Sequence, residues 1–237
     1  MARKAAATTS MNHTERLAGT IFFVVYLLVM PLLADRLFAL FEVLLDTRID
    51  AGLQNALYYY ILFAVTLVIF HGYIGATTTK FFDSLNRSLG TLFLSLLVFY
   101  GANELMYRIA NLFFHSRTNL NDTTIAAQVS AAPRTTALIV VFLAPFVEEV
   151  LFRGLVFGCV KEKSRVVAYA VSSLLFAFLH VWTFALSAWD LSYLTLMAQY
   201  LVPGLVFAWA YDRSGTLWTS ILLHAVVNAL ALFVILT

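Results

Sequence analysis

The chain has 237 residues, of which 62% are hydrophobic and only 12% are charged. A typical soluble domain is about 45–50% apolar and about 25% charged, so a soluble fold could not bury this much apolar surface. The formal net charge of +2 gives no support to a nucleic-acid partner, and the single cysteine excludes an intrachain disulfide and a cysteine-based metal cluster. We therefore expect an all-α, polytopic bundle of transmembrane helices embedded in a lipid bilayer.

A transmembrane helix needs about 20 predominantly apolar residues. Seven segments qualify, near residues 18–34, 54–75, 89–112, 135–158, 166–186, 192–210 and 216–236. The first follows a short polar leader and has no clear small-residue cleavage site, so we expect a retained span. Residues 36–50 mix charged and apolar side chains, which is typical of an interfacial amphipathic helix, and an inserted eighth segment is the alternative.

Residues 115–134 are rich in Asn, Thr, Ser and Ala and are expected to form the longest polar loop. This loop divides the chain into N-terminal spans, within residues 1–134, and a C-terminal core, residues 135–237. The compact size suggests a bacterial source, so we expect a multi-pass protein of the bacterial plasma membrane.

Basic residues indicate the orientation, because Lys and Arg are retained on the cytoplasmic side. With the N-terminus inside, nine fall in cytoplasmic segments: Arg3, Lys4, Arg16, Lys80, Arg87, Lys161, Lys163, Arg165 and Arg213. Five fall on the opposite side: Arg36, Arg48, Arg108, Arg117 and Arg134. The distribution favours a cytoplasmic N-terminus.

Three charged residues interrupt the apolar run of the fourth span: Glu148, Glu149 and Arg153. A charge at the centre of a span costs at least about 2.5–3.5 kcal/mol on insertion scales, and ionisable residues at this depth are functional by default. Glu149 and Arg153 are spaced i, i+4 and should pair on one helical face, whereas Glu148 projects about 100° away and can address a different cavity. A purely structural ion pair between helices is the alternative.

Two histidines lie at a comparable depth, His180 on the fifth span and His224 on the seventh, where Asn228 follows one turn later. Counted from the basic ends of their spans, Glu149 and both histidines lie about 16–23 Å along their helices, since a helix rises 1.5 Å per residue. We therefore expect Glu148, His180, His224 and Asn228 to converge on one cavity.

Such a cavity contains the groups needed to hydrolyse an amide with water as the nucleophile. Glu148 and His180 can share the proton of the water, and His224 with Asn228 can donate hydrogen bonds to the developing oxyanion. The alternative is a zinc site in which Glu148, His180 and His224 are ligands and the fourth position is open.

The sequence of residues 144–154 contains Glu-Glu-x-x-x-Arg, and it is followed by Phe-x-x-x-His at 176–180 and His-x-x-x-Asn at 224–228. This ordered set resembles the CPBP family, which includes type II CAAX prenyl proteases and bacterial Abi-type proteins, over about residues 135–232. The resemblance implies a helical membrane protease in which Glu148 and His180 activate water and His224 with Asn228 stabilise the oxyanion. Glu149 and Arg153 would then support the site, and no metal or other cofactor would be needed.

The function that we expect is therefore intramembrane proteolysis of a membrane-associated or leader peptide. One alternative is a non-proteolytic membrane scaffold or bacteriocin-immunity protein, for which Glu148 would be dispensable. A transporter with a proton relay is a further alternative, but a relay predicts carboxylates spread along a path, whereas Glu148 and Glu149 are adjacent.

Overall fold

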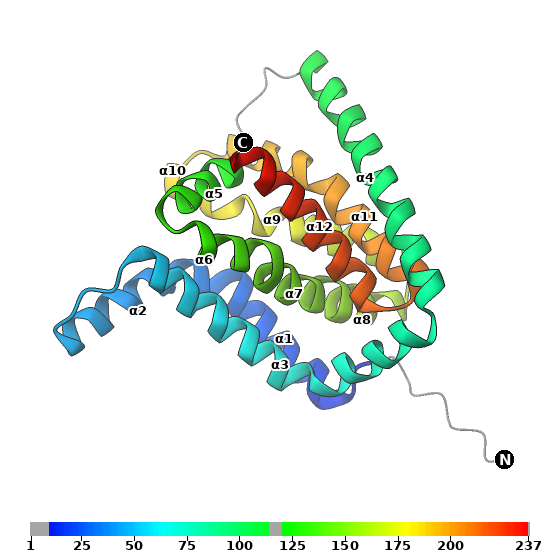
Figure 1. The fold of residues 1–237 in the computed structure, drawn as a ribbon, viewed down its shortest axis with the longest axis horizontal. Coiled ribbons are helices and arrows are strands. Elements are labelled where there is room, and N and C mark those ends of the chain that lie inside the picture. The colour runs from blue at the N-terminus through cyan, green and yellow to red at the C-terminus, as the bar shows by residue number, and fades with distance from the viewer. Residues whose placement is uncertain (1–9, 114–119, 237) are drawn as a thin grey trace.

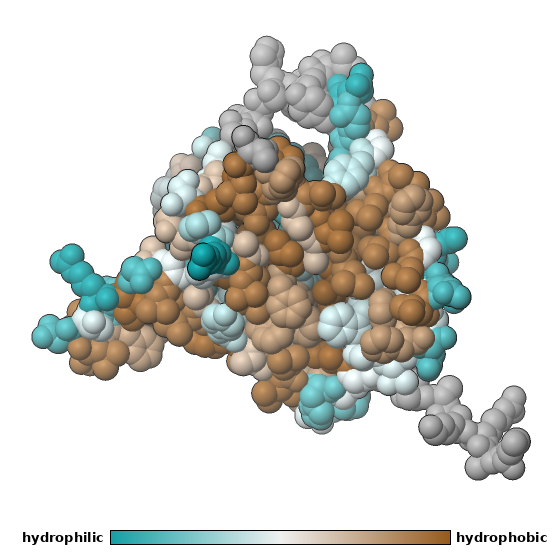
Figure 2. All heavy atoms as spheres, in the orientation of Figure 1, coloured by the Kyte–Doolittle hydropathy of each residue, from teal (hydrophilic) through white to brown (hydrophobic). Residues whose placement is uncertain are grey.

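The computed structural model describes residues 10–113 and 120–236, and within these ranges the protein is helical and has no strand (Figure 1). Six helices are long and apolar enough to cross a membrane, and a bent pair of helices raises the number to seven. The expected all-α bundle of about seven spans is confirmed. Figure 2 shows a face that is predominantly hydrophobic, with hydrophilic residues gathered toward its periphery, as contact with lipid requires.

The first span is longer than expected. Three segments, α1 (His13–Val24), η1 (Val25–Val29) and α2 (Met30–Leu45), form one helix of 33 residues. The residues expected to form an interfacial amphipathic helix, 36–50, are helical up to Leu45, and they continue the first span because no helix-breaking residue separates the two. The helix α2 has no buried residue and projects from the body (Figure 1). The basic leader residues Arg3 and Lys4 lie outside the described part.

A polar contact fixes the start of this long helix against the second span. Asn12 and Glu15 form a capping box at the beginning of α1. The other oxygen of Glu15 accepts a 2.7 Å hydrogen bond from the backbone N–H of Tyr73 in α3 (Ala51–Asp83). This N–H is available because the backbone of α3 leaves helical geometry at Phe70, three residues earlier.

The third span is α4 (Leu85–Phe113). The expected polar loop over residues 115–134 is wrong in part, because α5 (Leu120–Ala131) is helical. Its alanine and glutamine residues have a high helix propensity. The Asn, Asp, Thr and Ser residues of the same segment are the ones that suggested a loop. Residues 114–119, including the basic Arg117, lie outside the described part.

The fourth span is the central element of the bundle. It comprises α6 (Pro133–Leu138), η2 (Ile139–Leu143), α7 (Ala144–Glu149), η3 (Val150–Phe157) and α8 (Gly158–Lys161). Its most apolar stretch is 72% buried, against 17–33% for the other five spans, so the other helices surround it. The π-helical segments η2 and η3 flank α7, and π-helical turns occur frequently at functional sites.

The remaining helices pack around this centre. They are α9 (Arg165–Leu179), α10 (Trp182–Ala188), η4 (Leu191–Met197), α11 (Ala198–Ser214) and α12 (Leu217–Leu236). The chain bends by 42° between α9 and α10, so the region expected to be the fifth span consists of two helices at an angle. This break lies at His180 and Val181, and it therefore coincides with one of the predicted site residues.

Candidate active site

The charged residues of the central span are fully enclosed. Glu148 is 7% exposed, and Glu149 and Arg153 are 0% exposed. Arg153 Nη1 donates a 2.8 Å hydrogen bond to Glu149 Oε1, so the ion pair expected from the i, i+4 spacing is present. A buried pair of this kind persists only where further hydrogen bonds satisfy its remaining polar atoms.

The guanidinium of Arg153 has such partners on two neighbouring helices. Its Nη2 donates a 3.1 Å hydrogen bond to the backbone carbonyl of Gly204 in α11. Its central carbon lies 4.4 Å from the ring centroid of Phe176 in α9 and 5.3 Å from that of Phe207 in α11. Arg153 can reach both helices because α9 and α11 pack closely at Gly204. A Cβ atom at this glycine would lie only 3.0 Å from the Cα of Ser173, so a larger residue would push the two helices apart.

His224 on α12 contacts both carboxylates. Its Nδ1 lies 2.9 Å from Glu149 Oε1, and its Nε2 lies 4.0 Å from Glu148 Oε2. The expectation that Glu148 and Glu149 address different cavities is therefore wrong, because one imidazole lies between them. A carboxylate accepts hydrogen bonds, so Nδ1 carries the proton in its contact with Glu149. The opposite ring nitrogen, Nε2, faces Glu148.

Oε2 is buried and without a hydrogen-bond partner in both carboxylates, those of Glu148 and Glu149, among the residues that the structure describes. Glu149 is nevertheless held through its Oε1, which contacts Arg153 and His224, whereas Glu148 has no such hydrogen bond. A buried polar atom without a partner is rare and calls for an explanation. Oε2 of Glu148 and Nε2 of His224 are close enough together to hydrogen-bond the same water molecule.

His180 lies at the end of α9, where the span breaks. Its Nδ1 is 2.8 Å from the carbonyl of Phe176, which belongs to the last turn of the helix. The Phe176 ring lies 4.6 Å from the His180 ring and 5.8 Å from the His224 ring, so it packs against both imidazoles. No hydrogen bond joins His180 to Glu148 in the described residues, and the convergence of all four predicted groups stays a prediction.

Asn228 contacts the backbone of the central span at a carbonyl group that lacks its usual donor. Its Nδ2 donates a 2.8 Å hydrogen bond to the carbonyl of Val140 in η2. In a π-helical turn this carbonyl would accept from the N–H five residues later, but that residue is Pro145, which has no N–H. Asn228 thus supplies the missing donor, and its expected hydrogen bond to an oxyanion stays a prediction.

The donor set does not fit the zinc alternative. Over residues 10–113 and 120–236 no group of three His, Cys, Asp or Glu side chains is arranged to hold a metal ion. Glu148, His180 and His224 are therefore not placed as three ligands of one ion.

Comparison with known proteins identifies the C-terminal part of the chain. Residues 130–230 match the family model described as type II CAAX prenyl endopeptidase Rce1-like. The match covers less than half of the chain. The matched region contains all six predicted site residues and begins only three residues before the central span.

Two curated bacterial proteins are similar to part of the chain. The protein of Bacillus subtilis named "Putative membrane peptidase YdiL" is 30% identical over 115 residues, which are 47% of this chain and 41% of YdiL. The UPF0177 protein YxdF of Lactococcus lactis is 29% identical over 86 residues, which are 36% of this chain and 42% of YxdF. The matches thus span less than half of each relative. No solved structure matches the chain significantly.

Two residues of the candidate site, Gly204 and Phe207, were not predicted from the sequence, and Phe176 was noted only as part of a motif, without a role. Phe207 stacks on His224 at 4.5 Å between ring centroids, with 24° between the planes, and so fixes one face of the imidazole. A glycine after Pro203 within an apolar span was a usable signal for Gly204, because glycine there indicates close helix contact. Nothing distinguishes Phe207 from the other phenylalanines before the helices are packed.

Proposed function

We propose that the protein is an intramembrane endopeptidase that hydrolyses a peptide bond in a membrane-associated protein or leader peptide. The observation that carries this proposal is the buried, unpartnered Oε2 of Glu148, which lies 4.0 Å from Nε2 of His224. The match of residues 130–230 to an endopeptidase family supports it. The name of YdiL points to the same class of activity.

In this mechanism Glu148, assisted by His180, takes a proton from water, and the oxygen of that water attacks the carbonyl carbon of the scissile bond. The carbonyl oxygen becomes an oxyanion, which accepts a hydrogen bond from Nε2 of His224 and from Asn228. Glu149 holds the orientation of the His224 imidazole, because its carboxylate accepts the Nδ1 proton. When the tetrahedral intermediate collapses, the C–N bond breaks and the proton held by Glu148 passes to the leaving amine.

Glu148→Gln tests the proposal, because glutamine keeps the shape of the side chain but removes the base. We expect cleavage to fall about 10²–10⁴-fold, with membrane abundance near that of the wild type. Glu162→Gln is a matched control, since it changes an exposed glutamate beyond the end of the central span. Native membranes supply the substrate, and peptides retained by Glu148→Gln but not by the wild type identify it by mass spectrometry.

The competing functions predict other results in the same experiment. A scaffold or immunity protein keeps its phenotype when Glu148 is replaced, and wild-type cleavage by Glu148→Gln would remove Glu148 as the base. Chelator is added to the wild type as well, because loss of cleavage on chelation would replace the water-only mechanism with a metal-dependent one.

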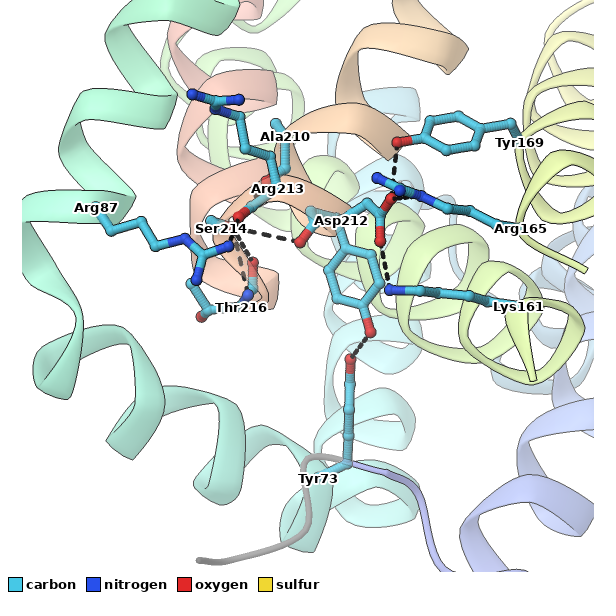
Figure 3. Close-up of polar contacts among 11 residues, drawn as sticks. Tyr73, Arg87, Lys161, Arg165, Tyr169, Ala210, Asp212, Arg213, Ser214 and Thr216 are labelled. Atoms are coloured by element: carbon cyan, nitrogen blue, oxygen red, sulfur yellow. Dashed lines mark hydrogen bonds and ion pairs between the residues drawn. The ribbon is translucent and has the colours of Figure 1, made fainter.

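We further propose that the protein lies in the bacterial cytoplasmic membrane with its N-terminus inside. Several of the basic residues counted as cytoplasmic gather at one end of the bundle, as Figure 3 shows. Asp212 accepts hydrogen bonds there from Lys161, from Arg165 at 2.6 Å and from Tyr169 at 3.0 Å. Arg87 donates to a backbone carbonyl of the same end of α11.

Cysteine labelling of intact cells tests this orientation in a background in which Cys159 is replaced by alanine. A cysteine at exposed Lys163 should react with an impermeant maleimide only after the membrane is permeabilised, whereas one at exposed Arg48 should react from outside. The reverse pattern would overturn the orientation.

A further inference from the structure

Three tyrosines from the N-terminal spans pack on the same side of the central span as Glu148. Tyr26 belongs to η1, and Tyr58 and Tyr59 belong to α3. The packing of these two spans against the central span places the tyrosines in the neighbourhood of Glu148. All three precede residue 130, where the match to the endopeptidase family begins.

The packing of the first span against the central span explains the position of Tyr26. The rings of Phe23 and Phe152 meet edge to face with 5.3 Å between centroids. Tyr26 lies one turn after Phe23 on its helix, and Glu148 lies one turn before Phe152. Since neighbouring helices that run in opposite directions place these turns side by side, Tyr26 is brought to the level of Glu148.

The second span brings the other two tyrosines to the same region. Tyr59 packs with Phe63 against a buried cluster that includes Leu143, and the Phe63 ring lies 4.8 Å from that of Phe146. The rings of Tyr58 and Tyr59 are 5.1 Å apart and nearly perpendicular. Tyr60, the next residue, is 48% exposed and lies on the outer side of the helix.

The phenol hydroxyls have hydrogen-bonding capacity that the fold does not use. Within the described part of the chain, no hydrogen bond is formed by the hydroxyls of Tyr26, Tyr58 or Tyr59. A tyrosine hydroxyl in apolar surroundings normally has a partner, so these three donors are available to a ligand. The adjacent carboxylates of Glu148 and Glu149 would repel an anion, which leaves a neutral acceptor as the fitting chemistry.

Building on the peptidase function above, we propose that Tyr26, Tyr58 and Tyr59 form a subsite that binds the uncharged main chain of an extended substrate peptide. A peptide must unwind for its scissile carbonyl to reach Glu148, and its unpaired carbonyl groups then cost several kcal/mol each in the membrane interior. The phenol hydroxyls donate hydrogen bonds to those carbonyls. They thereby orient the scissile bond toward Glu148, and the N-terminal spans contribute directly to substrate binding.

The kinetic test compares Tyr→Phe variants with a control from the same helix. Each variant keeps the ring and its packing and removes only the hydroxyl. The probe is a library of synthetic fluorescent peptides with about 20 apolar residues and a central glycine, reconstituted with the purified protein in liposomes. We expect Tyr26→Phe, Tyr58→Phe and Tyr59→Phe each to lower kcat/KM about 2–10-fold at unchanged abundance, and Tyr60→Phe to match the wild type.

A binding test separates this subsite from the catalytic proposal. A photo-crosslinking amino acid replaces Tyr58 or Tyr60 in the Glu148→Gln background, and the same peptides are illuminated with each protein. Crosslinking from position 58 that is absent from position 60 supports the subsite. Equal yields at both positions, or none at position 58, would overturn it.

The two proposals therefore fail in different ways. Cleavage that depends on Glu148, with tyrosine variants indistinguishable from Tyr60→Phe, removes the subsite and keeps the peptidase. Crosslinking specific to position 58 without any cleavage that depends on Glu148 keeps a peptide-binding site and removes the peptidase.

Discussion

Replacing Glu149 by glutamine should destabilise the protein, because it removes the charged partner of a fully buried cation. Arg153 and Glu149 are both 0% exposed and are joined by a 2.8 Å hydrogen bond. In the variant, Arg153 keeps the carbonyl of Gly204 and two aromatic rings but no anion in direct contact. Loss of one partner of a buried ion pair costs about 3–5 kcal/mol. Glu149→Gln also removes the anion beside Nδ1 of His224, so activity should fall together with stability.

An exposed pair with the same spacing supplies the control. Arg108 and Glu104 on α4 are also i, i+4, but their side chains are 73% and 58% exposed, and exposed helical pairs contribute only about 0.3–0.5 kcal/mol. For a protein of this size, 1 kcal/mol shifts Tm by about 2–4 °C, so Glu149→Gln should lower Tm by at least about 6 °C and Glu104→Gln by at most about 2 °C. Thermal unfolding in detergent and abundance in membranes measure the two effects. Equal shifts for the two variants would refute the reasoning, as would full abundance of Glu149→Gln.

Two further substitutions test how the first span is held. Gly19→Ala should destabilise the protein by about 1–3 kcal/mol, because its Cβ would lie 2.5 Å from the buried Phe70 ring. Gly75→Ala is the control, since its Cβ would meet no atom within 4 Å, and it should lower Tm little. Equal Tm values for the two variants would contradict the prediction. The Arg16 guanidinium donates to Glu162 and lowers the pKa of this carboxyl. The pair is therefore fully stabilising above the ordinary pKa of 4.5 and loses its contribution as the pH falls through the lowered pKa, so the Tm difference between wild type and Glu162→Gln should close on acidification. A difference that is independent of pH would show that the ion pair is not its cause.

Features of the site that depend on one helix were predictable from the sequence. The Glu149–Arg153 pair follows from helical spacing alone, and the membrane spans follow from the length of the apolar runs. The ends of helices were less predictable where the sequence changes from apolar to polar residues but contains no glycine or proline that would end a helix. This explains why α2 continues the first span, and why the polar residues of α5 were taken for a loop.

Features that depend on contact between helices were not predictable. The sequence places His224 at the right depth but does not show that its ring lies between Glu148 and Glu149, because rotation of α12 about its axis sets that contact. The hydrogen bond from Asn228 to Val140 is an intermediate case. Pro145 shows that one backbone carbonyl lacks its donor, but only the packed structure shows which side chain replaces it.

The charged and polar groups of the central span divide into two sets. Arg153 uses Glu149, a backbone carbonyl and two rings, and Glu149 also holds Nδ1 of His224, so part of the cost of burying these charges is offset within the fold. Nε of Arg153 and Oε2 of Glu149 have no hydrogen-bond partner among the described residues. Glu148 Oε2 has no such role in the described residues, although keeping it in the membrane interior costs free energy. A structural function for the site explains the first set alone. Only a function that uses a carboxylate beside an imidazole explains why Glu148 is placed there as well, and for this reason Glu148→Gln is the decisive variant.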